Sequence, residues 1–195
     1  MSVAEKLSLL SIEDYLAAEL VSDEKHEYLG GVVYAMTGAS NRHNTISGNV
    51  FASLHTRLRG KPCRPFNSDT KIRVSLPQVR FYYPDMSVVC QPRDPADSYQ
   101  EDPKLLVEVL SRRTRRIDEG EKKDVYLGLP SLAVYLLIEQ EFAAVVVLRR
   151  NDSGFAREVY QGINAIVPIP ELGMELPLNE VYETVDFAAE AESQG

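Results

Sequence analysis

Two acidic residues occupy positions where a carboxylate is unusual. Glu108 lies inside the apolar run 105–110, and Asp85 follows Pro84 directly before the apolar run 86–90. An ionised carboxylate in a buried strand is costly unless a cation or hydrogen-bond donors compensate its charge. If the two runs are neighbouring strands, the carboxylates meet and repel each other, and a shared metal ion relieves that repulsion. Oxygen ligands favour Mg²⁺ or Mn²⁺.

Both residues also have ordinary structural interpretations. Glu108 could pair with an arginine or a lysine in a simple buried ion pair. Asp85 could be a turn residue after a proline, which is a common position for aspartate. The residues by themselves leave these alternatives open.

Two helices are expected before these runs. A capping pattern that begins at Ser11 predicts a helix over residues 12–20. Apolar residues at four-residue steps predict a longer helix over residues 44–59, with Ser40 or Asn41 as its N-cap. Both helices would present one apolar face to a sheet.

Period-two patterns and short apolar runs predict the strands. A Gly-Gly pair within residues 27–34 predicts a tight hairpin, and residues 114–127 predict a further helix after a loop over 91–103. The remaining strands are expected over residues 72–76, 81–90, 105–110, 132–138, 142–149 and 155–160. This order indicates an α/β (α+β) fold with a mixed sheet flanked by helices, preceded by an N-terminal helix and a β-hairpin.

The composition describes an ordinary globular chain of 195 residues with a net charge of −8. A single domain is expected over residues 1–187, with 188–195 as a flexible tail. The acidic balance argues against nucleic-acid binding unless basic residues cluster. Cys63 and Cys90 are expected to be reduced core residues of a cytoplasmic protein, and no apolar run approaches the ~20 residues of a membrane span.

Several segments together carry a resemblance to a known family. They are Tyr83-Pro84-Asp85-Met86-Ser87-Val88-Val89-Cys90, Leu106-Val107-Glu108-Val109-Leu110-Ser111, Thr114-Arg115-Arg116-Ile117-Asp118-x-Gly120-Glu121-Lys122-x-x-x-Tyr126 and Pro130-Ser131-Leu132-x-x-Tyr135. With Glu27-Tyr28-Leu29-Gly30-Gly31-Val32 and His43, they resemble the Uma2 family, also called DUF820, over residues 12–181. That family belongs to the PD-(D/E)XK superfamily. The resemblance implies a restriction-endonuclease-like core and a metal-dependent endonuclease that hydrolyses phosphodiester bonds in DNA.

The resemblance also implies roles for individual positions. Asp85 and Glu108 would bind Mg²⁺ or Mn²⁺, and Glu27 would complete the catalytic site. The superfamily's lysine usually lies two residues after the glutamate, where this chain has Leu110. The Uma2 pattern points instead to a lysine on the following helix, and Lys122 matches it.

Lys122 has a competitor and an alternative role. Lys123 is its neighbour, but only Lys122 shares a helical face with Asp118 and Tyr126 at four-residue spacing. The alternative is that Asp118 and Lys122 form a surface ion pair without a catalytic role.

Substrate contacts are expected at a basic cluster after the glutamate strand. Arg112, Arg113, Arg115 and Arg116 could bind a backbone phosphate, or they could be a solvated helix start. His43 could contact a ligand or serve in capping. The expected partners are DNA and a second copy of the chain in a homodimer. A catalytically inactive DNA- or protein-binding module on the same fold is the alternative function.

Overall fold

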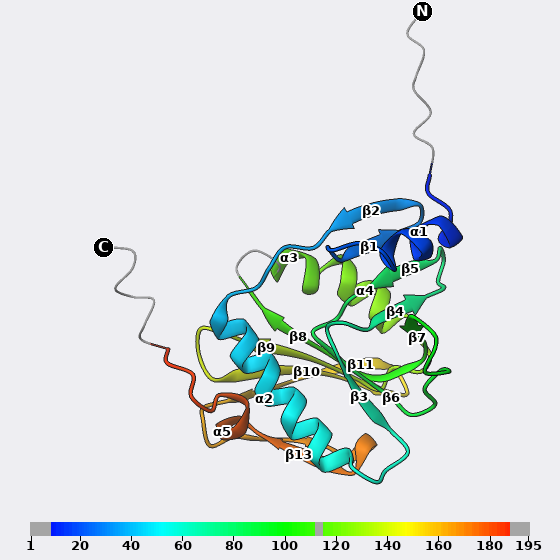
Figure 1. Ribbon diagram of the computed structural model, residues 1–195. Helices are drawn as coiled ribbons and strands as arrows, with labels where there is room; N and C mark the ends of the chain where they lie inside the picture. Colours follow the sequence, from blue (N-terminus) through cyan, green and yellow to red (C-terminus); the bar gives the residue numbers. More distant parts are fainter. Residues whose placement is uncertain (1–8, 112–114, 188–195) are drawn as a thin grey trace, which may run out of the picture.

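A six-stranded mixed sheet forms the centre of the molecule (Figure 1). The computed structural model describes residues 9–111 and 115–187, without the side chains of Arg116 and Ile117. In spatial order the strands are β11 (Gly154–Gln161), β10 (Ala144–Asn151), β9 (Val134–Glu139), β8 (Pro103–Leu110), β6 (Met86–Val89) and β3 (Arg64–Asn67). Strands β8 and β9 are parallel, whereas β6 runs antiparallel to β8. The sheet is therefore mixed, as the sequence predicted.

Two smaller sheets flank the central one. The larger contains, in order, β2 (Val32–Ala35), β1 (His26–Leu29), β5 (Arg80–Tyr82), β4 (Lys71–Val74) and β7 (Tyr99–Gln100). The smaller pairs β12 (Ile166–Ile169) with β13 (Met174–Pro177), joined through the 3-10 helix η1 (Pro170–Leu172) and followed by α5 (Leu178–Val181).

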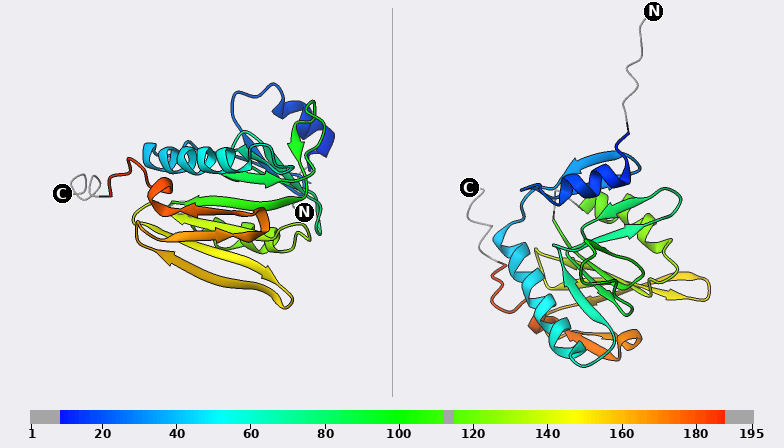
Figure 2. Two further views of the ribbon diagram at one scale, coloured as in Figure 1. Left: turned by 90° about the horizontal axis from the view of Figure 1, so that it is seen from below. Right: turned by 45° about the vertical axis from the view of Figure 1, so that its right-hand side comes forward.

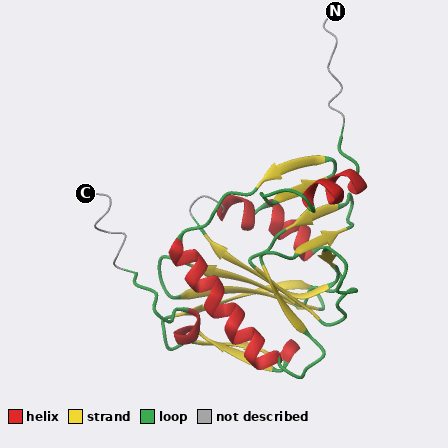
Figure 3. Cartoon of the chain, viewed as in Figure 1, coloured by secondary structure: helices red, strands yellow, loops and turns green. Residues whose placement is uncertain are grey.

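The long helix α2 (Asn41–Leu58) covers one face of the central sheet (Figures 2 and 3). Its apolar stripe is fully or nearly fully buried there and consists of Ile46, Val50, Leu54 and Leu58. The short helices α3 (Arg115–Asp118) and α4 (Glu121–Leu127) lie on the opposite side. Side chains of a strand alternate between the two faces. Leu105, Val107 and Val109 of β8 accordingly pack in the α2 core, and Leu106 and Leu110 pack in the α4 core.

The N-terminal helix and hairpin agree with the predictions. Helix α1 (Ile12–Glu19) begins after Ser11, whose hydroxyl accepts a 3.0 Å hydrogen bond from the Asp14 amide. Gly30 and Gly31 turn the β1–β2 hairpin with φ values of 60° and 104°, which other residues rarely adopt.

Two predicted elements are each divided in the structure. The strand expected over 81–90 is β5 and β6, which belong to different sheets, and Pro84 lies in the break between them. Proline lacks the N–H of a ladder hydrogen bond and restricts the residue before it, so the chain changes direction here. The helix expected over 114–127 is α3 and α4, separated at Gly120. The first break leaves Asp85 outside any regular strand.

The prediction of two reduced cysteines is wrong for this structure. Cys63 and Cys90 form a disulfide with an S–S distance of 2.06 Å. The reason is the antiparallel register of β3 and β6, which pairs Arg64 with Val89 and so brings the residue before Arg64 opposite the residue after Val89. Strand β3 was not predicted, and this pairing was therefore not foreseen. Within residues 9–111 and 115–187, no helix has the length and apolar character of a membrane-spanning segment.

Candidate active site

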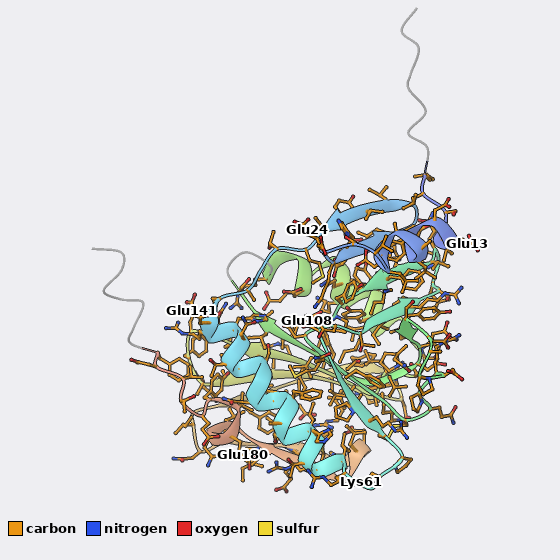
Figure 4. The ribbon with its side chains drawn as sticks, viewed as in Figure 1. Glu13, Glu24, Lys61, Glu108, Glu141 and Glu180 are labelled. Carbon is orange, nitrogen blue, oxygen red and sulfur yellow. A yellow bond between two sulfur atoms is a disulfide. The ribbon has the colours of Figure 1, made fainter. Side chains whose placement is uncertain are left out.

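A cavity of about 940 Å³ opens at the edge of the central sheet where β8 ends and β6 begins. Its lining comes from the chain before β1, the connection from β2 to α2, the first turns of α2, the segment before β6, the end of β8 and helices α3 and α4. Asp85, Glu108 and Lys122 are among the lining residues. Glu108 is labelled near the centre of the molecule in Figure 4.

Asp85 and Glu108 are tied to each other through the backbone. The Asp85 amide donates to Glu108 Oε2 at 3.3 Å, and the Val109 amide donates to Asp85 Oδ2 at 2.7 Å. The register between β6 and β8 pairs Met86 with Val107, so the residue before β6 faces the end of β8. The carboxylates of Asp85 and Glu108, which were predicted to converge, therefore lie where β6 begins and β8 ends.

Lys122 supplies the positive charge beside these carboxylates. Its Nζ lies 2.8 Å from Glu27 Oε1, 3.7 Å from Glu108 Oε1 and 3.9 Å from Asp118 Oδ1. The lysine is 7% exposed and Asp118 is 3% exposed, so the surface ion pair considered as an alternative is excluded. Lys123 instead pairs with the exposed Asp124.

Glu27 reaches Lys122 from strand β1 of the second sheet. Its Oε1 lies 2.8 Å from the Lys122 ammonium, a close ion pair between two nearly buried side chains.

The site is electrostatically crowded with negative charge. Desolvation raises the pKa of Glu108 well above its usual range, Lys122 opposes that rise, and Asp118, Asp85 and Glu27 add to it. Burial by itself would lower the pKa of Lys122, but Glu108, Glu27 and Asp118 raise it above its ordinary value. Lys122 is therefore a fixed cation, and the carboxylates around it outnumber it.

His43 joins the site from the first turn of α2. Ser40 caps this helix, accepting a 3.2 Å hydrogen bond from the His43 amide, and the imidazole Nε2 lies 3.1 Å from Asp85 Oδ2. Burial lowers the pKa of His43, but the hydrogen bond and charge of Asp85 outweigh it and raise the pKa above its usual value. Of the two residues predicted as caps, Ser40 is the one used.

Comparison with known proteins assigns this chain to a family. A family model described as "Uma2: Putative restriction endonuclease" matches residues 12–179. The chain belongs to the Uma2 family. Two uncharacterized proteins of Synechocystis sp. are similar to it: slr1290 is 34% identical over 91% of this chain and 94% of that protein, and sll1609 is 29% identical over 72% and 80%.

A solved structure shares the fold of this Uma2 chain. The crystal structure of a putative nuclease belonging to DUF820 from Anabaena variabilis superposes with a TM-score of 0.65 at 18% identity, covering 89% of this chain and 97% of that one. At that identity the likeness establishes the fold, and the predicted restriction-endonuclease-like architecture is confirmed. The family description indicates a restriction-endonuclease-like nuclease.

Of the four arginines predicted to bind a phosphate, the structure describes the side chain of Arg115 alone. Arg115 makes a bidentate pair with Glu139 at the end of β9, with N–O distances of 2.9 and 2.5 Å, and also contacts Glu119. Arg112 and Arg113 lie outside the described residues, as does the side chain of Arg116. The Arg115 guanidinium is thus already paired with carboxylates of the same chain.

Two buried residues of the site had no role assigned from the sequence. The Tyr126 hydroxyl donates to Glu108 Oε1 at 3.5 Å, and Asp118 stands beside Lys122. Their four-residue spacing from Lys122 was the available signal, because it places all three on one face of the single helix predicted over residues 114–127.

The donor set fits a hard divalent ion. Asp85 and Glu108 present carboxylate oxygens to a common cavity, and Mg²⁺ is usually held by one or two carboxylates with water and substrate phosphate completing its shell. Within residues 9–111 and 115–187, no group of three or more His, Cys, Asp and Glu side chains is arranged around a single ion.

Proposed function

We propose that this Uma2 protein is a metal-dependent endonuclease that hydrolyses phosphodiester bonds in DNA. The observation that carries the proposal is the convergence of Asp85, Glu108 and Lys122 on one cavity. Two carboxylates and a buried cation meet there from three separate segments of the chain. The family's description as restriction endonucleases supports this reaction class over other chemistry that needs a metal.

Each residue has a distinct task in this reaction. Asp85 and Glu108 would hold Mg²⁺ or Mn²⁺, which when bound offsets phosphate charge and lowers the pKa of a water ligand. Lys122 donates hydrogen bonds toward the phosphate or the attacking water, and it stays protonated because three carboxylates surround it. Glu27 fixes the ammonium group, and His43 fixes the Asp85 carboxylate.

The test is cleavage of supercoiled plasmid with Mg²⁺ or Mn²⁺. The wild type should nick the plasmid, EDTA should stop it, and Asp85→Asn and Glu108→Gln should each lose at least about 100-fold in rate. Asp152→Asn and Glu183→Gln are matched controls, because they make the same chemical changes at exposed positions. Equal nicking by all five proteins would identify a contaminant and refute the proposal. Binding of DNA without any cleavage would favour the inactive binding module.

Cutting both strands of a duplex also leads us to propose a homodimer with two active sites. Light scattering should give twice the 21.9 kDa of one chain. A monomeric mass would reject the dimer and leave the proposed chemistry in place.

A further inference from the structure

The charges of this protein are segregated along the chain. Residues 28–68 contain no Asp or Glu, although the chain has 29 of them, and they contain five of its 21 Lys and Arg residues. The negative balance of the protein is therefore carried entirely by the rest of the chain. A locally basic region in an acidic protein is the footprint expected of a surface for a polyanion.

Helix α2 occupies the middle of this acid-free segment and connects two distinct places. At its N-terminal end, His43, Asn44 and Ser47 line the cavity that holds Asp85 and Glu108. At its C-terminal end, Arg59, Lys61 and Arg64 are exposed, and we call these three residues the basic end of α2. In Figure 4, the label of Glu141, which also lines the cavity, lies beside the N-terminal end of α2. The label of Lys61 marks the C-terminal end.

The basic end of α2 keeps its charge available. Within the described residues, no carboxylate pairs with Arg59 or Arg64, and Lys61 bonds only to the backbone carbonyls of Leu172 and Gly173. Arg57, one turn earlier, provides the contrast, because Glu180 neutralises it through a bidentate pair. The three cations beyond Arg57 therefore have no acidic partner inside the fold.

The distance between the two ends suits a nucleic-acid strand. At 1.5 Å per residue, the 16 positions from His43 to Arg59 span about 24 Å. A strand of B-DNA advances about 3.4 Å per phosphate, so roughly seven phosphates separate the cavity from the basic end. The exposed α2 residues along this path carry no acidic group that would repel them.

We infer that the outer face of α2 is a backbone-binding track, along which a DNA strand runs from the cavity to Arg59, Lys61 and Arg64. The inference rests on the proposed function for its choice of ligand. The contacts are to phosphates, so the track contributes affinity and orientation without reading the base sequence. It also explains how a chain with a net charge of −8 binds DNA, since the positive charge is concentrated where the strand lies.

The experiment measures fluorescence anisotropy of a labelled duplex of about 20 base pairs in EDTA, between about 50 and 200 mM salt. The test variant is Arg59→Gln/Lys61→Gln/Arg64→Gln. The control is Arg80→Gln/Lys123→Gln/Arg157→Gln, which changes the net charge equally at other positions. We expect the test variant to bind at least tenfold more weakly and its log–log salt slope to fall by about 2 to 3, while the control stays near the wild type.

These outcomes test the DNA-binding track independently of the proposed phosphodiester hydrolysis. If test and control variants lose affinity equally, or neither does, the track is refuted, whatever the plasmid assay shows. If only the test variant loses affinity, the track stands, even where the wild type cuts no plasmid and the proposed hydrolysis fails. A wild type that binds no duplex at about 50 mM salt refutes the track outright.

Discussion

Asp85 and Glu108 hold each other in place through two backbone amides. The Asp85 amide donates to the Glu108 side chain at 3.3 Å, and the amide next to Glu108, that of Val109, donates to the Asp85 side chain at 2.7 Å. Each carboxylate is thereby held by a backbone amide of the chain segment that carries the other. The position of either side chain depends on the pairing of β6 with β8 and needs no bound ion to define it.

The first prediction separates this structural role of Asp85 from its chemistry. Asp85→Ala removes the acceptor of the Val109 amide, and an unsatisfied buried N–H costs about 1–3 kcal/mol of unfolding free energy. Asp85→Asn keeps an acceptor oxygen and should stay within about 1 kcal/mol of the wild type, yet it should lose cleavage as severely as alanine. Urea denaturation and the plasmid assay measure the two effects. An Asp85→Ala protein as stable as Asp152→Ala would contradict the structural role.

The second prediction concerns Arg115. Because it forms a bidentate pair with the nearly buried Glu139, Arg115→Gln should mainly destabilise the fold. The arginine side chain is 37% exposed, so the cost is discounted to about 1–2 kcal/mol of unfolding free energy. DNA affinity measured well below the melting temperature should match the wild type. A tenfold loss of affinity without a loss of stability would instead restore a phosphate-binding role.

These two cases show what the sequence could and could not reveal about the site. Glu108 was recognisable because a carboxylate in an apolar strand demands a partner, and Asp85, directly before a second apolar run, was the second carboxylate. The family pattern then pointed to Lys122. The partner of Arg115 was not recognisable, because Glu139 lies 24 positions later and meets it only through the parallel pairing of β8 with β9. Local patterns identify unusual residues, whereas long-range register decides which of them are already satisfied.

The same contrast between local patterns and long-range pairing applies to the secondary structure. The hairpin, α1 and α2 carry their own turn, cap and stripe signals, and all three were predicted. Strands β3, β12 and β13 are four residues long and lack an alternating apolar pattern strong enough to stand out. Missing β3 also hid the disulfide, because only its pairing with β6 brings Cys63 to Cys90.

The third prediction uses the buried Lys71, whose Nζ donates to the Tyr83 hydroxyl at 3.3 Å. Desolvation lowers the pKa of Lys71 below its ordinary value, against the charge of Glu19. Between the folded and unfolded pKa values the unfolded chain binds more protons, so this group makes stability rise with pH there. Lys71→Met should flatten that rise and be at least as stable as the wild type at pH 7. Urea denaturation from neutral to alkaline pH tests this, and an unchanged pH dependence would contradict it.

The fourth prediction uses the neighbouring lysines as a matched pair. Lys122→Met leaves Glu27, Glu108 and Asp118 without their shared cation, and breaking a buried ion pair costs about 3–5 kcal/mol, less where a carboxylate takes up a proton. Lys123→Met makes the same chemical change at a partly exposed position of α4 and should change stability by less than about 0.5 kcal/mol. Thermal melts of the two variants should therefore differ clearly.

Cleavage rates complete this comparison. Lys122→Met should lose about 100- to 1,000-fold in rate, as expected for removal of a donor to the transition state, whereas Lys123→Met should cut normally. Lys122→Arg keeps the charge and so preserves the fold, but its planar guanidinium replaces a compact ammonium held by Glu27, and its rate should stay well below that of the wild type. This variant keeps the test valid where Lys122→Met does not fold. If Lys122→Arg and Lys123→Met both cut at the wild-type rate, Lys122 acts only as a buried counter-ion for Glu108.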